Sequence, residues 1–259
     1  ENGGDQATYL RHMAHAGKRL AELHIALASN RDLPEFAPEP TRSEDLQRWI
    51  DEIVARAERV FDTLKQRRSS LKEAERLLAD QLQAQHDMLP ERLKALLPRD
   101  TDGFNIRHHG DLHLGQLLVV KDDVFIIDFD GGPGRTIAER RRKAPPARDV
   151  AGLIRSIDYA ATAALERALK VFPDESGRLS LALAEWRDQA ADTLLAAYRV
   201  TMAGQRLWPN EAKAADRLLN FFLLEKAFYE IEYELANRPD WLRVPLRPAR
   251  PLPITKVRS

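Results

Sequence analysis

The sequence has no cysteine, so it can form neither a disulfide bond nor a thiolate metal site. It also has no secretory signal and no uninterrupted apolar run long enough to cross a bilayer. Its 40 basic and 40 acidic residues cancel, whereas a dedicated nucleic-acid binder normally carries a basic excess. We therefore expect a cytoplasmic protein that binds neither nucleic acid nor a membrane.

Two familiar phosphate-binding motifs are missing as well. The pattern Gly-x-x-x-x-Gly-Lys-[Ser/Thr] does not occur. Gly132-Pro-Gly134 begins a Gly-x-Gly-x-x-Gly pattern, but Ile137 occupies its last position. Neither a P-loop nor a dinucleotide-binding turn is therefore indicated.

Most of the chain carries the apolar spacing of amphipathic helices. Thr41-x-x-Glu44 and Ser70-x-x-Glu73 are typical of capping boxes, and Pro90 suits the first turn of a short helix that Pro98 ends. The basic segment 135–148 is expected to be mostly irregular. The expected helices cover approximately residues 10–27, 45–66, 70–85, 90–98, 149–171, 178–203 and 211–236.

The middle of the chain differs from the rest because it contains two short β-prone runs. Leu117–Val120 and Val124–Ile127 are joined by Lys121-Asp-Asp123, which predicts a β-hairpin. The resulting prediction is a predominantly α-helical α+β fold with one small hairpin near its centre.

Polar residues flank this hairpin on both sides. Gln116 precedes its first strand and Asp128 follows its second, so the two side chains are expected to lie about 5 Å apart at Cβ. Amide and carboxylate oxygens are hard ligands that suit Mg²⁺. Asp130, in the run Ile127-Asp-Phe-Asp130, is a further candidate ligand. The sequence therefore predicts a magnesium site at the base of the hairpin.

A glycine-containing loop lies just before the hairpin, in His109-Gly-Asp-Leu-His-Leu-Gly-Gln116. The carboxylate of Asp111 could accept the proton of an attacking hydroxyl, and phosphoryl transfer needs little more than positioning and charge neutralisation. His109 is expected to hold the loop through hydrogen bonds. His113 could contact either the substrate or Asp111.

Structural interpretations compete with this one. An aspartate in a glycine loop is often only a turn residue, and Asp-Phe-Asp is often only a strand end. The cluster His108, His109, Asp111 and His113 could instead hold zinc. We favour catalysis because a loop rather than a helix carries this cluster, and because zinc would leave the Gln/Asp pair unused.

One helix presents a mixed face of Lys226, Tyr229, Glu230 and Tyr233, which recur at i, i+3, i+4 and i+7. Such a face could bind a sugar through hydrogen bonds and an aromatic ring. It could equally be a salt-bridged helix face with tyrosine packed at its edge.

These motifs resemble a known group of enzymes. His109-Gly-Asp111 with Ile127-Asp128 resembles the aminoglycoside phosphotransferase and choline kinase group of protein-kinase-like enzymes. The chain is more narrowly similar to maltokinase, a kinase domain often fused to trehalose synthase. The segments that carry this closer resemblance are His108–Gln116, Arg148–Gly152, Asp158–Ala161, Leu224–Ala227 and Asn237–Trp241.

The resemblance implies ATP-dependent phosphorylation of maltose to maltose 1-phosphate, in trehalose and glycogen metabolism. It would make Asp111 the base at the anomeric hydroxyl and Gln116 and Asp128 the Mg²⁺ ligands. Asp149 would match the helix-borne aspartate that supports the catalytic loop. On the sugar side, the resemblance favours Lys226, Glu230 and Tyr233 as ligands, and His113 is a further candidate for substrate binding.

The sequence also departs from this family. Asp128-Phe-Asp-Gly-Gly-Pro133 stands where the family usually has Asp-Phe-Glu-Gly-Glu-Pro, so Asp130 is one methylene shorter and Gly132 replaces a glutamate. These differences bear on how many metal ions bind and on the choice of nucleotide.

The implied domain is the C-lobe of such a kinase, spanning 1–259 as one unit. It would be helical over 1–100, carry the catalytic loop and hairpin over 106–134, be helical again over 149–237 and end in an extended tail over 238–259. We expect that the β-rich N-lobe that such a kinase uses to contact ATP is not part of this sequence. We therefore expect weak sugar binding and little activity without the N-lobe or a fused trehalose synthase domain. The alternatives are a kinase for another hydroxyl and an idle interaction module.

Overall fold

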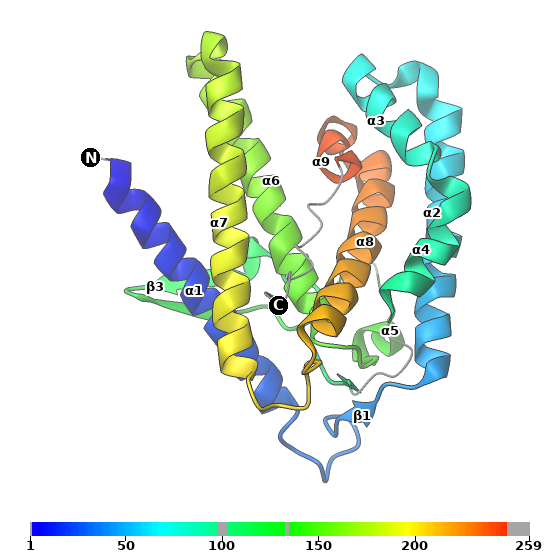
Figure 1. Cartoon of the computed structure of the whole chain (residues 1–259), viewed down its shortest axis with the longest axis vertical. Helices are drawn as coiled ribbons and strands as arrows, with labels where there is room; N and C mark the ends of the chain where they lie inside the picture. The colour runs from blue at the N-terminus through cyan, green and yellow to red at the C-terminus, as the bar shows by residue number, and fades with distance from the viewer. Residues whose placement is uncertain (1, 98–102, 133–134, 248–259) are drawn as a thin grey trace, which may run out of the picture. The chain divides into compact units, whose positions relative to one another are not determined.

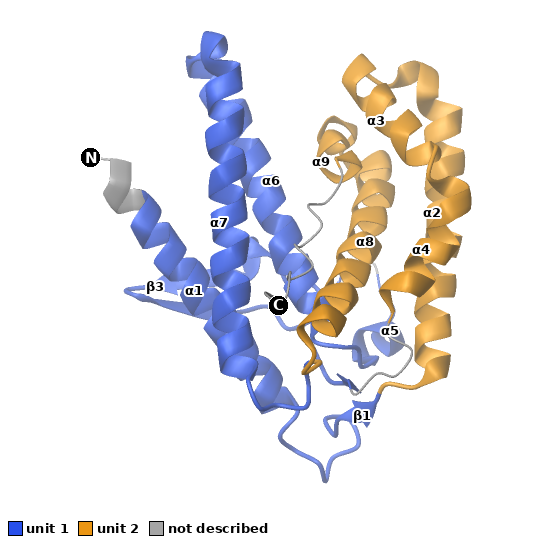
Figure 2. Ribbon diagram, in the orientation of Figure 1, with its two compact units in different colours: residues 1–40, 103–208 blue, residues 41–102, 209–259 orange. Residues whose placement is uncertain are grey.

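The computed structural model describes residues 2–97, 103–132 and 135–247, with side chains described from Gln6 onward. The chain divides into two compact units (Figure 2). Unit 1 consists of residues 1–40 and 103–208, and unit 2 consists of residues 41–102 and 209–259. The chain therefore passes from one unit to the other three times, whereas the sequence suggested a single unit.

Unit 1 is built around three long helices. Its elements are α1 (Asn2–Leu27), β1 (Glu39–Pro40), β2 (Phe104–Asn105), η3 (Leu114–Gln116), β3 (Leu117–Val120), β4 (Asp123–Ile126), α5 (Ile137–Arg141), α6 (Ala147–Val171), η4 (Pro173–Glu175) and α7 (Ser176–Met202). Helix α7 packs against both α1 and α6 (Figure 1). A Cβ at Gly17 would overlap the carbonyl oxygen of Leu194, so glycine is what allows α1 to approach α7 so closely.

The core of unit 1 lies between these three helices. Side chains at helical spacing from each helix are completely buried there, which is the burial that the apolar stripes of the sequence predict. They include Leu20, Leu153, Ile157, Leu194 and Tyr198.

The predicted hairpin is present in unit 1. Strands β3 and β4 are antiparallel, with Leu118 opposite Phe125 and Val120 opposite Asp123. The second strand begins at Asp123 rather than at Val124, because Lys121 adopts a left-handed conformation (φ 56°) and closes the turn with only two residues. A second antiparallel pair, β1 with β2, was not predicted.

Unit 2 is helical. Its elements are α2 (Ser43–Arg67), η1 (Arg68–Ser70), α3 (Glu73–Gln83), η2 (His86–Met88), α4 (Leu89–Leu96), α8 (Ala212–Asn237), η5 (Pro239–Trp241) and α9 (Arg243–Leu246). Helix α8 packs against α2, α4 and α9 (Figure 1). Aromatic rings meet edge to face in its core, where Trp49 contacts Phe222 and Phe61 contacts Phe228.

The two predicted capping boxes are out of register. In α2 the N-cap is Arg42, whose backbone N–H donates to Asp45 at 3.0 Å. In α3 the backbone N–H of Lys72 donates to Glu75 at 3.1 Å. Ser70 instead donates its hydroxyl to the carbonyl of Arg67. In each helix an acidic side chain at position N3 accepts the N-cap N–H. Asp45 lies one residue beyond the predicted Glu44, and Glu75 lies two residues beyond the predicted Glu73.

Two further predictions need correction. The segment 135–148 contains the short helix α5, whose Thr136 N–H donates to Glu139 at 2.8 Å in a capping box that sequence analysis missed. The tail is not extended throughout, because residues 239–246 form η5 and α9, in which Leu242 and Val244 are buried. The rest of the tail, 248–259, lies outside the described residues.

In the parts of the chain that are described, none of the helices has the length and apolar content that crossing a membrane requires.

Candidate functional site

The loop that contains Asp111 is held to helix α6 by one carboxylate. Asp149, in the first turn of α6, accepts the backbone N–H of His109 at 2.7 Å and that of Gly110 at 2.9 Å. The start of the same loop is tied down where Ile106 and Ala144 exchange backbone hydrogen bonds of 3.0 and 3.1 Å. The loop backbone is therefore fixed from Ile106 to the turn at Gly110.

Asp149 is itself part of a buried polar chain. Nε2 of His24 lies 3.1 Å from the Asp149 carboxylate, and Nδ1 of His24 lies 2.9 Å from the hydroxyl of Tyr198. Burial alone would raise the pKa of Asp149. The hydrogen bond from His24, the nearby histidines and the N–H of Gly110 outweigh it and hold that pKa well below its usual range. Asp149 is therefore an ionised carboxylate, and both of its oxygens accept hydrogen bonds.

His109 links the loop to the end of the hairpin. Its Nε2 donates to the carbonyl of Ile127 at 2.9 Å, and its Nδ1 faces the backbone N–H of Asp111 at 3.3 Å. Its ring also packs against Phe129, with ring centroids 5.2 Å apart. The backbone of Asp111 is thus tied through one imidazole to the segment that carries Asp128.

Helix α6 approaches the second half of the loop very closely. The hydroxyl of Ser156 accepts the backbone N–H of Leu114 at 3.0 Å. A Cβ at Gly152 would lie 2.7 Å from the carbonyl oxygen of Leu112, so only glycine fits at that position. Two turns of α6 therefore support the loop from Leu112 to Leu114.

Gln116 and Asp128 meet at the base of the hairpin. The backbone N–H of Ile127 donates to the carbonyl of Gln116 at 3.0 Å, and the two side chains face each other with Nε2 of Gln116 3.0 Å from Oδ2 of Asp128. Asp128 has φ 63°, a left-handed conformation that non-glycine residues adopt at an energetic cost and that is frequent at functional sites.

The donor chemistry of this pair fits Mg²⁺. An amide and a carboxylate supply hard oxygen ligands, and Mg²⁺ usually takes only one or two protein ligands beside phosphates and water. Asp130 is exposed in the turn beyond Asp128, and its role as a further ligand stays a prediction. Among the residues that the structure describes, no three His, Asp or Glu side chains gather to hold a metal ion, which includes the four residues of the zinc alternative.

His113 is turned back over its own loop. Its Nδ1 accepts the backbone N–H of Gly115 at 3.0 Å and caps η3. Its Nε2 lies 3.4 Å from Nε2 of Gln116. A Cβ at Gly115 would come within 2.9 Å of the ring, so glycine leaves room for this fold-back.

The predicted sugar-binding residues belong to unit 2, whereas Asp111, Gln116 and Asp128 belong to unit 1. On α8, the Lys226 ammonium lies 4.8 Å from the centroid of the Tyr229 ring, and Tyr229 stacks on Tyr233 at 6.4 Å. Tyr233 is 43% exposed and Glu230 only 7%. Helical spacing thus placed these side chains on one face correctly, and their sugar contacts stay a prediction.

Sequence reasoning missed several contributors. No role was assigned from the sequence to His24, Ser156 or Tyr198. A polar residue at a core position was the available signal for His24, because such a side chain needs a buried partner. Arg238, which lies 5.2 Å from the Tyr233 ring centroid, extends the aromatic face and was also missed.

Curated proteins that the chain matches include two glucosamine kinases. The protein from Streptacidiphilus jiangxiensis is 32% identical over 165 residues, which cover 60% of this chain and 35% of the relative. The protein from Mycolicibacterium smegmatis (strain ATCC 700084 / mc(2)155) is 32% identical over 139 residues, which cover 53% of this chain and 32% of the relative. The chain thus matches about a third of the length of each.

Solved structures of glucosamine kinase are also similar. One, in complex with glucosamine, ADP and inorganic phosphate, has a TM-score of 0.71 and 27% identity over 95% of this chain and 52% of that chain. Another, described as crystal form B, has a TM-score of 0.69 and 26% identity over 92% of this chain and 51% of that chain. The chain spans about half the length of these structures.

The predicted kinase-like, mainly helical fold is therefore confirmed, while its restriction to a C-lobe stays a prediction. The model of the phosphotransferase enzyme family (APH) matches residues 2–186, which include the Asp111 loop, the hairpin and Asp149. The chain belongs to this phosphotransferase enzyme family, of the aminoglycoside phosphotransferase type.

Proposed function

We propose that this chain is the catalytic lobe of a sugar kinase, which transfers the γ-phosphoryl group of ATP to a sugar hydroxyl. The observation that carries the proposal is the fixed loop of Asp111 beside the Gln116–Asp128 pair, tied together through His109. The glucosamine kinase relatives support a sugar as the acceptor.

Asp111 is proposed to accept the proton of the attacking sugar hydroxyl. Gln116 and Asp128, with Asp130 as a further ligand, would hold Mg²⁺, which neutralises charge on the phosphates. The chain's own contribution is positioning, because Asp149 and His109 fix the loop backbone while the hairpin fixes both metal-binding side chains.

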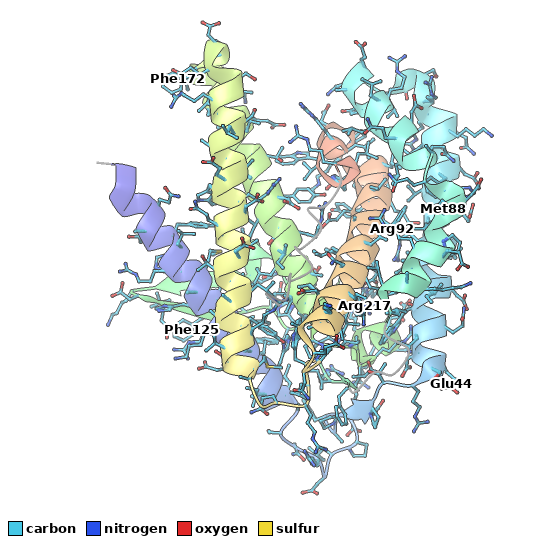
Figure 3. All side chains as sticks on the ribbon, in the orientation of Figure 1. Glu44, Met88, Arg92, Phe125, Phe172 and Arg217 are labelled. Carbon is cyan, nitrogen blue, oxygen red and sulfur yellow. The ribbon has the colours of Figure 1, made fainter. Side chains whose placement is uncertain are left out.

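The hairpin offers an apolar surface for the nucleotide base. Leu118 and Phe125 are directly opposed on one face and are 50% and 53% exposed (Phe125 is labelled in Figure 3). An adenine ring placed on this surface would bury its apolar side chains. This favours ATP binding beside Gln116 and Asp128. The remaining ATP contacts would come from an N-lobe, so we expect little turnover by these 259 residues alone.

For the acceptor we propose maltose, bound through Lys226, Glu230 and Tyr233. Cations surround the aromatic face of α8: the Lys226 ammonium lies over Tyr229, and Arg238 lies over Tyr233 while ion-paired to Glu234 at 2.7 Å. The positive charge of Lys226 beside this face would repel a sugar that carries a protonated amine, so the face favours a neutral sugar at Tyr233.

Glucosamine is the second candidate acceptor. It is favoured by the relatives, since two of the curated proteins that match are glucosamine kinases and one solved structure contains glucosamine with ADP and phosphate. A buried carboxylate such as Glu230 could then pair with the amino group of the sugar.

Isothermal titration of the chain with maltose, glucosamine and an aminoglycoside separates these candidates. We expect maltose binding that falls at least tenfold in Tyr233→Ala and survives in Tyr233→Phe, because the phenylalanine ring keeps the stacking surface. Binding of glucosamine in place of maltose would select the second candidate. No response to any sugar or to MgATP would leave an interaction module.

Phosphoryl transfer gives the second test. Asp111→Asn should abolish sugar phosphorylation by the protein that contains this chain while sugar affinity stays unchanged, since the asparagine cannot accept the proton. Undiminished transfer would remove Asp111 as the base. Robust turnover by the 259 residues alone would contradict the need for an N-lobe.

A further inference from the structure

We propose that His113 is a positioning residue for the metal site: its Nε2–H donates to the amide oxygen of Gln116 and turns that oxygen towards the cation beside Asp128. The inference rests on the proposed function, because it concerns the Mg²⁺ that Gln116 and Asp128 would hold. This role differs from the contact with substrate or with Asp111 that the sequence suggested for His113, which stays a prediction.

The first step is the tautomer of His113. Its Nδ1 lies 3.0 Å from the backbone N–H of Gly115 and can only accept there, so that nitrogen carries no proton. In a neutral imidazole the proton then sits on Nε2. His113 therefore presents a donor, not an acceptor, to whatever lies beside Nε2.

The second step is the partner of that donor. One terminal atom of the Gln116 amide lies 3.4 Å from Nε2, and the same amide atom lies 3.0 Å from Oδ2 of Asp128. With nitrogen at this position, the amide donates to Asp128 but sets two N–H donors against each other at His113. With oxygen there, His113 donates to Gln116, but two oxygens face each other at Asp128. Rotation of the amide by half a turn exchanges the two arrangements.

A divalent cation resolves the second arrangement. Two oxygens that are adjacent ligands of octahedral Mg²⁺ lie about 2.9 Å apart, since each is about 2.0–2.1 Å from the ion. The observed separation of 3.0 Å between the amide atom and the carboxylate oxygen matches this spacing. The amide nitrogen therefore suits the metal-free site, and the amide oxygen, held by His113, suits the metal-bound site.

This role is distinct from the cap that His113 provides to η3. The cap uses Nδ1 and the N–H of Gly115, whereas the proposed orientation of the amide uses Nε2. Two substitutions separate the functions. His113→Asn keeps an acceptor close to the position of Nδ1 and loses the distant donor. His113→Gln keeps a donor close to the position of Nε2 and loses the near acceptor.

The test measures binding of Mn²⁺ alone to the whole chain by electron paramagnetic resonance. Groups that orient a metal ligand typically contribute 10- to 100-fold to metal affinity. We expect His113→Asn to bind Mn²⁺ at least tenfold more weakly than the unmodified chain, and His113→Gln to stay within about threefold. In Gln116→Ala the substitution His113→Asn should have no further effect, because its target is gone.

A second readout does not depend on metal affinity. The long-range ¹H–¹⁵N spectrum of the His113 ring should show the proton on Nε2, and addition of Mg²⁺ should shift the side-chain amide of Gln116. A proton on Nδ1 overturns the inference. The reverse order of Mn²⁺ affinities, with His113→Asn normal and His113→Gln weakened, overturns it too. That order is expected if His113 does nothing except cap η3.

Failure of the proposed function gives a different result. If neither the unmodified chain nor any His113 variant binds Mn²⁺ and Asp128→Asn makes no difference, the metal site itself is absent, and both proposals fall together. If the unmodified chain binds Mn²⁺, Asp128→Asn abolishes binding and all His113 variants bind equally, only the role of His113 is overturned.

Discussion

The carboxylate of Asp149 and the backbone of His109 are joined across 40 positions of sequence by a hydrogen bond of 2.7 Å. The other carboxylate oxygen accepts the N–H of Gly110, and Nε2 of His24 lies 3.1 Å from the oxygen that His109 contacts. One ionised side chain therefore fixes the turn before Asp111 and joins it to the core of three helices.

Asp149→Asn should lower the free energy of unfolding by about 3 kcal/mol, because the amide can accept only one of the two backbone N–H groups and turns its own NH₂ against the other. Urea denaturation followed by circular dichroism measures the loss. Asp122→Asn is the matched control, since that aspartate is 84% exposed beside Arg11 and should change nothing measurable. Equal stability of both variants would show that Asp149 does not support the loop.

Gly152→Ala should destabilise the protein by about 1–3 kcal/mol, because the new Cβ would press on the carbonyl of Leu112 and push α6 away from the loop. Gly177→Ala, near the start of α7, meets nothing within 4 Å and should instead stabilise it by up to about 1 kcal/mol. Thermal unfolding measures the loss of stability in Gly152→Ala and the gain in Gly177→Ala. A neutral Gly152→Ala would mean that helix and loop are not in close contact.

His108 should make the stability depend on pH. Burial, with positive charge on Arg148 and Arg135, lowers the pKa of His108 from 6.5 to about 4. The unfolded chain therefore takes up a proton at His108 near pH 6.5, whereas the folded chain takes it up only near pH 4. The free energy of unfolding should fall as the pH drops through this window, by on the order of 3 kcal/mol.

His108→Phe isolates this contribution. Neither ring nitrogen of His108 has a hydrogen-bond partner among the described residues, so the substitution removes a titrating group without breaking a hydrogen bond. Urea denaturation at a series of pH values should give a flatter profile between pH 6.5 and 4 in the variant. Parallel profiles for the two proteins would contradict a buried, neutral His108.

The hairpin should loosen when its anchor on α1 is removed. Arg19 donates two hydrogen bonds to Asp123, at 2.9 and 2.6 Å, and lowers the pKa of that carboxyl to about 2. Arg19→Met should speed amide hydrogen exchange in β3 and β4 while leaving α6 unchanged, because the Arg19 guanidinium contacts Asp123 of the hairpin and Glu22 of its own helix α1. Arg11→Met, which removes the looser 3.6 Å contact with Asp122, should leave exchange in the hairpin unchanged.

The sequence was informative where the deciding contacts are local. The hairpin pattern brought Gln116 and Asp128 together because a two-stranded ladder fixes which residues are opposed, and helical spacing placed Lys226, Tyr229 and Tyr233 on one face.

Contacts between distant segments were not predictable in this way. His24 meets Asp149 from 125 positions away, and no periodicity indicates which buried polar groups will pair. The strands β1 and β2 have two residues each and include Pro40, so neither carries the alternation that marks a strand. The acidic N3 residues of α2 and α3 were missed because several adjacent residues could have capped each helix.

The close approach of α1 and α7 at Gly17 has a practical consequence for anyone who wishes to shorten this protein. The family match ends at residue 186, within α7, but Leu194 and Tyr198, which pack on Gly17 and His24, lie beyond it. A protein that ends at residue 186 would lose part of the core of unit 1. It would also lose the Tyr198 hydroxyl that contacts His24. Trimming should therefore retain the segment through Trp208, where unit 1 ends.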